Sequence, residues 1–147
     1  MAGKSGVSLH WGGFDKALGK AAHKLANTQP LMETIGEVLV SGTLQRFQDE
    51  EDPDGKKWKP SIRAMATGDK TLSDTGRLQR SIDYAATSDK VMVGTNVVYG
   101  RIHQLGGKTG KGHKVDMPAR PYLGVSEEDM KEIRGTVEDF LKDALKE

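Results

Sequence analysis

Apolar residues recur every three or four positions in two long stretches of this sequence, which is the spacing of a helix with one buried face. The first helix is predicted from its cap residue Thr28 to about Asp49. Gly36 and Gly42 lie inside it and cost on the order of 1 kcal/mol each in helix propensity, so we expect another element to cross closely there. Its apolar positions are Leu31, Ile35, Val38, Leu39 and Phe47.

The second long helix is predicted from Ser126 to Leu145 and has the cleaner amphipathic pattern. Ser126 and Asp129 have the spacing of a capping box, in which each side chain satisfies a backbone N–H of the other. We expect both long helices to pack on one small sheet, with Ile133 in the shared core. A shorter amphipathic pattern predicts a further helix at 14–26.

Alternating apolar residues between the long helices predict a β-hairpin. One strand is expected at 82–87 and its antiparallel partner at 90–95, with a short connection at 88–90. Because an isolated hairpin is only marginally stable, we expect a further strand at 114–117, and the weak alternation at 7–11 offers another. The predicted fold class is therefore α+β, a small antiparallel β-sheet packed against long α-helices.

The first thirteen residues are rich in glycine and serine and are interpreted as a flexible N-terminal arm or an edge segment. A single α+β domain is then predicted for residues 14–147. Trp11 is unusual in such an arm, because a bulky aromatic side chain gains from burial. Two interpretations stay open: the arm folds back on its own domain, or it docks on a neighbouring subunit.

Periodicity is lost between Glu50 and Asp74. The stretch from Glu50 to Pro60 is predicted to be a solvated turn that Trp58 anchors to the core. Its acidic residues lack the spacing of a calcium-binding loop, so no calcium site is predicted there. Residues 61–74 are expected to be irregular and partly disordered.

A short helix is predicted at 98–105, with Val98, Ile102 and Leu105 on one apolar face. Glycines at 106 and 107 are expected to end this helix. The glycine- and lysine-rich stretch up to Lys114 has too few apolar residues to pack, and we predict that it is a mobile loop.

Two prolines, Pro118 and Pro121, remove two backbone donors, so the segment around them cannot be a central strand. We expect it to run along an edge and to deliver Tyr122 and Leu123 to a buried place. Arg120 is aimed by this stiff backbone, and a fixed guanidinium favours bidentate pairing with a carboxylate. Whether that pair lies within one subunit or crosses a subunit boundary stays open.

Four motifs follow one another along the chain: G-K-K-W at 55–58, T-G-R-L-Q-R-S-I at 75–82, V-G-T-N-x-x-Y-x-x-I-H-Q-x-G-G at 93–107 and P-A-R-P-Y-L-G at 118–124. In this order they resemble the phage virion morphogenesis family, the tail-completion proteins of Mu-like and related tailed phages. The resemblance covers the chain from about Leu31 to Val125.

The resemblance implies a non-enzymatic virion component that completes the tail and prepares it to join the head. It implies a ring of identical subunits at the head-proximal end of the tail. The partners would be copies of the chain itself and phage tail and head–neck proteins, with transient contact with packaged DNA as a further option. The protein would be assembled in the cytoplasm of the bacterial host and would end in the virion.

Composition adds limits to this interpretation. The 147 residues carry a net charge of +1, so no global field favours nucleic acid or a membrane. The absence of cysteine excludes disulfides and thiolate chemistry in this sequence. No apolar window approaches the length of a membrane span, and the first residues do not form a secretion signal.

No catalytic, cofactor-binding or metal-binding residues are predicted. His103 and His113 are separated by the predicted loop and, even with Asp116 nearby, lack the converging ligands of a metal site. We expect His103 to be hydrogen-bonded in the short helix. The sequence contains neither a G-x-S-x-G nucleophile motif nor a phosphate-binding loop.

A local basic patch is formed by Lys108, Lys111, His113 and Lys114. One interpretation is a solvated loop, and the other is a loop that faces DNA or an acidic surface of a partner. The favoured function is a structural assembly protein that presents surfaces to its partners. The alternative is a small nucleic-acid-binding module that uses this loop, which would show salt-dependent binding to DNA.

Overall fold

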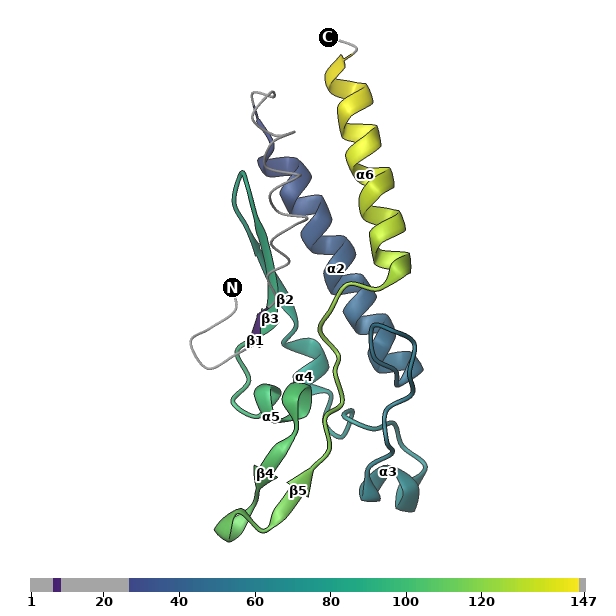
Figure 1. Ribbon diagram of the computed structural model, residues 1–147, viewed down its shortest axis with the longest axis vertical. Coiled ribbons are helices and arrows are strands. Elements are labelled where there is room, and N and C mark those ends of the chain that lie inside the picture. The colour runs from purple at the N-terminus through teal and green to yellow at the C-terminus, as the bar shows by residue number, and fades with distance from the viewer. Residues whose placement is uncertain (1–6, 9–26, 146–147) are drawn as a thin grey trace.

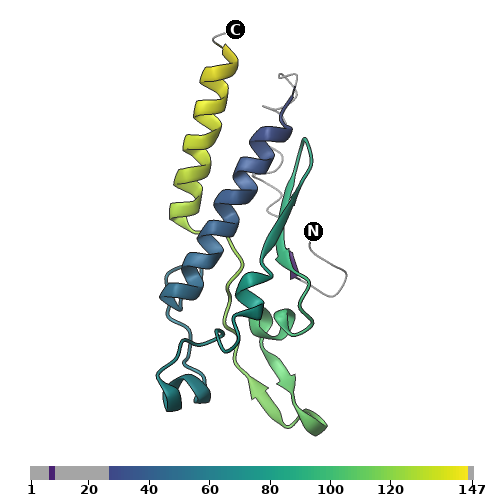
Figure 2. The same cartoon turned by 180° about the vertical axis from the view of Figure 1, so that it is seen from behind.

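The computed structural model describes residues 7–8 and 27–145 of the chain. Two long helices, α2 (Gln29–Asp49) and α6 (Glu127–Leu145), lie side by side along the molecule (Figure 1). A small sheet lies on the other side of α2, as the view from behind also shows (Figure 2). The predicted α+β fold class is confirmed. The helix predicted at 14–26 and Trp11 lie outside the described residues.

The small sheet is antiparallel and three-stranded, in the order β1 (Val7–Ser8), β3 (Val91–Thr95) and β2 (Asp83–Ala86). Tyr84 of β2 pairs with Val93 of β3, and the connection closes with a hydrogen bond from the backbone N–H of Thr87 to the carbonyl of Lys90, 2.9 Å long. The predicted hairpin is confirmed, and so is a further strand from the N-terminal stretch.

Helix α6 packs on α2 and not on the sheet, so the expectation that both long helices cover the sheet is wrong. The physical reason is that α2 has apolar residues on two faces and forms a middle layer. Gly36 and Gly42 mark the two contacts: a Cβ at Gly36 would clash with the ring of Tyr84, and one at Gly42 with the carboxylate of Asp129. The close crossings expected at these glycines are confirmed, and Ile133 is fully buried.

The stretch at 61–74 is not irregular throughout, because it contains α3 (Ile62–Thr67). The hydroxyl of Ser61 accepts a hydrogen bond from the backbone N–H of Ala64 at 3.0 Å, and Gly68 ends the helix with a φ of 79°. A six-residue helix is too short to show periodicity, so its caps are the local signal that defines it. A second short helix, α4 (Arg77–Arg80), leads into β2.

The helix predicted at 98–105 is shorter than expected and forms α5 (Gly100–Leu105). The predicted apolar stripe is buried only in part: Val98, which precedes α5, is 78% exposed and Leu105 57%, while Ile102 is half-buried. The hydroxyl of Thr95 accepts a hydrogen bond from the backbone N–H of Val97. The segment that joins β3 to α5 thus turns outward and leaves part of the predicted face in solvent.

The glycine- and lysine-rich stretch is not a loop throughout but a second hairpin, made by β4 (Gly107–Thr109) and β5 (Val115–Met117) around a 3-10 turn at Lys111–His113. The strand expected at 114–117 exists, yet it pairs with β4 and not with the main sheet. Backbone pairing needs no apolar core, and glycines with positive φ, 81° at Gly110 and 69° at Gly112, form the tight turn.

Candidate functional site

The extended segment at 118–124 is held by the other motifs of the chain. The side chain of Gln104 binds the backbone of this segment as a neighbouring strand would. Its Oε1 accepts hydrogen bonds from the backbone N–H groups of Tyr122 and Leu123, both 3.0 Å long. Its Nε2 donates to the carbonyl of Leu123 at 3.2 Å. The backbone N–H of Arg120 donates to the carbonyl of His103 at 2.7 Å. The I-H-Q and P-A-R-P-Y-L-G motifs therefore bind each other directly.

Aromatic rings also bury this segment: Trp58 of the G-K-K-W motif and Phe47 of α2 pack beside its own Tyr122. The indole Nε1 of Trp58 donates to the carbonyl of Pro121 at 2.8 Å, so the predicted anchoring role of Trp58 is confirmed. Phe47 lies with its ring centroid 5.6 Å from that of Trp58 and 5.5 Å from that of Tyr122. The hydroxyl of Tyr122 donates to the carbonyl of Gly100 at 2.7 Å, and burial raises the pKa of this phenol.

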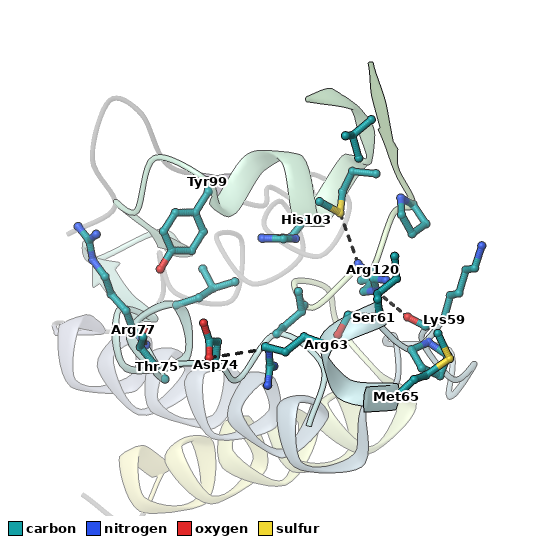
Figure 3. Close-up of a pocket in the computed structure, with 18 of the residues that line it drawn as sticks. Lys59, Ser61, Arg63, Met65, Asp74, Thr75, Arg77, Tyr99, His103 and Arg120 are labelled. Atoms are coloured by element: carbon teal, nitrogen blue, oxygen red, sulfur yellow. Dashed lines mark hydrogen bonds and ion pairs between the residues drawn. The ribbon is translucent and has the colours of Figure 1, made fainter. Parts of the chain in front are cut away.

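Beside this segment lies an open cleft with a volume of about 730 Å³, between α3 and the β4–β5 hairpin (Figure 3). Apolar side chains from both walls line it. Ile62 and Met65 of α3 are 84% and 67% exposed, and Val115 of β5 is also exposed. The apolar side chains that line the cleft are thus exposed to solvent, because no other described residue covers them.

Basic side chains surround this lining. Arg63 lies 3.3 Å from a carboxylate oxygen of Asp69 and 3.8 Å from one of Asp74, in exposed ion pairs. The guanidinium of Arg77 stacks over the ring of Tyr99, with 5.9 Å between its Cζ and the ring centroid. Lys59 also lines the cleft.

Arg120 lies at the inner end of the cleft and is only 4% exposed. Its Nε donates to the carbonyl of Lys59 at 2.6 Å, and its Nη1 lies 3.5 Å from the sulfur of Met117 (Figure 3). No acidic side chain pairs with Arg120 in the described part of the chain, so the internal carboxylate pair is not found there, while a pair across a subunit boundary stays a prediction. Burial lowers the pKa of this guanidinium.

His103 of α5 also lines the cleft, and its ring lies edge-on to that of Tyr99 with 5.9 Å between centroids. Its Nδ1 is buried and has no hydrogen-bond partner, so the expected hydrogen bond of the imidazole is not found at that atom. Burial, and secondly the charge of Arg120, lower the pKa of His103.

The residues of the predicted basic patch lie along the second hairpin. Lys108 pairs with Asp116 across the strands at 2.9 Å, with both side chains exposed. Lys111, His113 and Lys114 are exposed at the turn and do not line the cleft. Of the contact residues predicted from the sequence, only Arg120 reaches the cleft, and Trp11 cannot be placed. The described residues contain no cluster of ligands that could hold a metal ion, and none of their helices could span a membrane.

Sequence reasoning missed Arg46, which holds the extended segment from the side of α2. Its guanidinium donates to the carbonyls of Tyr122 and Gly124 at 2.7 and 3.0 Å, and to Asp129 at 3.0 Å. Its position in the sequence could have indicated its burial, because helical spacing places Arg46 on the buried face of α2. Reasoning from periodicity also missed Ile62 and Met65.

Comparison with known proteins places these motifs in one family. The phage virion morphogenesis family matches residues 9–142 of this chain. The chain is 36% identical over 130 residues to the Mu-like prophage FluMu G protein 2 of Haemophilus influenzae, covering 88% of this chain and 90% of that protein. It is 30% identical over 120 residues to the putative capsid assembly protein G of Escherichia phage Mu, covering 74% and 76%. No solved structure matches the chain.

Proposed function

Because this chain belongs to the phage virion morphogenesis family, a structural family of virion assembly, we propose that it completes the phage tail and joins the tail to the head. The match to that family over residues 9–142 carries the proposal. The relative from phage Mu, a putative capsid assembly protein, supports a role in building the particle. The chain would act through its surfaces and not through catalysis, in the virion and during assembly in the host cytoplasm.

The shape of the subunit supports action through unlike surfaces. Figure 1 shows α3 and the β4–β5 hairpin at one end of the molecule and the last turns of α6 at the other. Unlike surfaces on one subunit allow head-to-tail contacts, which close into a ring when the rotation between subunits permits it. We propose such a ring of identical chains, with tail and head–neck proteins as its partners. The exposed Lys111 and Lys114 would face an acidic partner surface or packaged DNA.

Deletion of the gene from its phage tests this function. We expect complete heads and unjoined tails in electron micrographs, and recovery of infectious particles when purified protein is added to the mixed extract. Joined, infectious virions from the deletion strain would contradict the proposal. Sedimentation of the purified chain tests the ring separately: we expect one species of several subunits, and a mass equal to that of one subunit would contradict the ring.

The second candidate function, a nucleic-acid-binding module, is favoured by one observation: Lys111, His113 and Lys114 lie together and exposed at the tip of a hairpin. A module of this kind would bind duplex DNA with an affinity that falls steeply as salt rises. The double substitution Lys111→Ser and Lys114→Ser would abolish that binding. If the single subunit does not bind DNA at low salt, this function is excluded.

A further inference from the structure

Two buried arginines of this chain differ in the way their charge is balanced. Arg46 is 5% exposed and pairs with Asp129, which is 5% exposed as well. Arg120 is 4% exposed, but its partners are a backbone carbonyl and a thioether. A neutral carbonyl and a sulfur atom compensate a buried cation poorly, since desolvation of a charge is costly without an anion beside it. The charge of Arg120 is therefore left for an external group to balance.

The guanidinium of Arg120 is the group that can bind an anion in this cleft. His103 lines the same cleft, and its Nδ1 has no hydrogen-bond partner. The Nη2 of Arg120 donates to no group among the described residues. A guanidinium has five donors in a planar fork. A carboxylate is the protein group that such donors fit best.

The outer part of the cleft is apolar and favours an apolar surface on the ligand. Ile62 and Met65 project from α3 with most of their surface in solvent, and Val115 lies exposed on the opposite wall. Exposed apolar side chains around one cavity gain free energy only when an apolar surface covers them, about 25 cal/mol per Å². A phosphate backbone offers no such surface, so the lining favours a protein partner over nucleic acid.

We propose that the cleft between α3 and β5 binds a segment of another virion protein, in which an acidic side chain reaches Arg120 and neighbouring apolar side chains cover Ile62 and Met65. The inference rests on the proposed assembly function, because it names the chemistry of the partner surface. In protein interfaces a few residues in well-packed, desolvated pockets carry most of the binding energy, and arginine is common among them. The partner segment would be short, since the cleft measures about 730 Å³.

A matched pair of small molecules tests the chemistry on the whole chain. 4-Phenylbutyrate carries an apolar ring and a carboxylate, and 4-phenylbutyramide has nearly the same shape without the charge. We expect saturable NMR shifts at His103 and at the Arg120 guanidinium with the acid, and binding weaker by about tenfold or more with the amide. Equal affinity for both compounds, or no shift at these residues with the acid, overturns the proposal, and so does equal binding of a short DNA duplex at this cleft.

Substitutions separate the cleft from the fold. The double variant Ile62→Ser, Met65→Ser changes two exposed side chains, so it should melt as the parent does but lose the phenylbutyrate shifts and the infectious virions. Val98→Ser is the control, because Val98 is 78% exposed and lies outside the cleft. Normal phage yield from the double variant overturns the proposal, whereas the deletion phenotype tests the assembly function independently. If sedimentation shows that the double variant fails only in self-association, the occupant is a second copy and the proposal of another virion protein is wrong.

Discussion

Arg46 and Asp129 form a buried ion pair that joins α2 to the first turn of α6, with 3.0 Å between Nη1 and Oδ2. The same Oδ2 accepts the backbone N–H of Ser126 at 3.1 Å, while the Ser126 hydroxyl accepts the backbone N–H of Asp129 at 3.0 Å. One carboxylate therefore closes the capping box of α6 and neutralises an arginine that also binds the segment at 118–124. Helix packing and the position of that segment depend on this pair together.

The first prediction concerns that pair. Asp129→Ala leaves Arg46 buried without an anion and removes a helix cap, so the free energy of unfolding should fall by about 3–5 kcal/mol. The double variant Arg46→Met, Asp129→Ala should lose less than the sum of the two single losses, because no unpaired charge remains. Urea unfolding of the four proteins measures the coupling.

Asp69→Asn is the control for this cycle. It breaks the exposed pair of Arg63 and Asp69, in which the carboxylate is 65% exposed, and should change stability by less than about 1 kcal/mol. Additive losses in the Arg46–Asp129 cycle would show that the two side chains do not stabilise the fold through each other.

Local patterns predicted a good part of this fold. The capping box at Ser126 and Asp129 and the hairpin at 82–95 depend on residues close in sequence, and both are present. The anchoring of Trp58 was also predicted, because a large aromatic side chain in a polar turn gains free energy when it is buried against the core. What these features share is that residue type and spacing alone decide them.

The cleft could not be predicted in the same way. The acceptor of Arg120 is a backbone carbonyl 61 positions away, and the carboxylate that pairs with Arg46 is 83 positions away. One sequence does not tell which of its 21 acidic residues meets which arginine. The lining of the cleft comes from α3, which is too short for periodicity, and from a hairpin whose strands are only three residues long each. Long-range pairing decides this site, and local propensity does not.

A second prediction concerns Gln104. Gln104→Leu leaves the backbone N–H groups of Tyr122 and Leu123 without an acceptor, so we expect a loss of about 1–3 kcal/mol in stability. Hydrogen exchange should accelerate at these two amides more than elsewhere. Gln104→Glu keeps an acceptor for both N–H groups but removes the donor to the carbonyl of Leu123, and it should be less destabilising than the leucine variant. The reverse order would contradict the role of Oε1.

The third prediction compares two helix glycines. An alanine Cβ at Gly42 would clash with the carboxylate of Asp129, whereas nothing lies within 4 Å of a Cβ at Gly135 in α6. Gly42→Ala should therefore push α6 away and lower the melting temperature, although alanine is the better helix former. Gly135→Ala should raise stability by up to about 1 kcal/mol. Thermal unfolding of both variants measures the two changes in melting temperature. Equal changes would show that α6 does not cross α2 closely at Gly42.

The last prediction is a pH dependence that comes from His103. Burial and the charge of Arg120 lower its pKa, so the folded chain binds a proton there less readily than the unfolded chain does, whose histidine pKa is about 6.5. The unfolded state then binds more protons in acid, and stability falls as the pH drops below about 6.5 toward the lower pKa of the folded state. His103→Gln cannot titrate, so its melting temperature should fall less than that of the parent between about pH 7.5 and pH 5. Thermal unfolding at both pH values measures the two differences. Equal acid sensitivity in parent and variant would show that the proton on His103 is bound as easily in the cleft as in the unfolded chain.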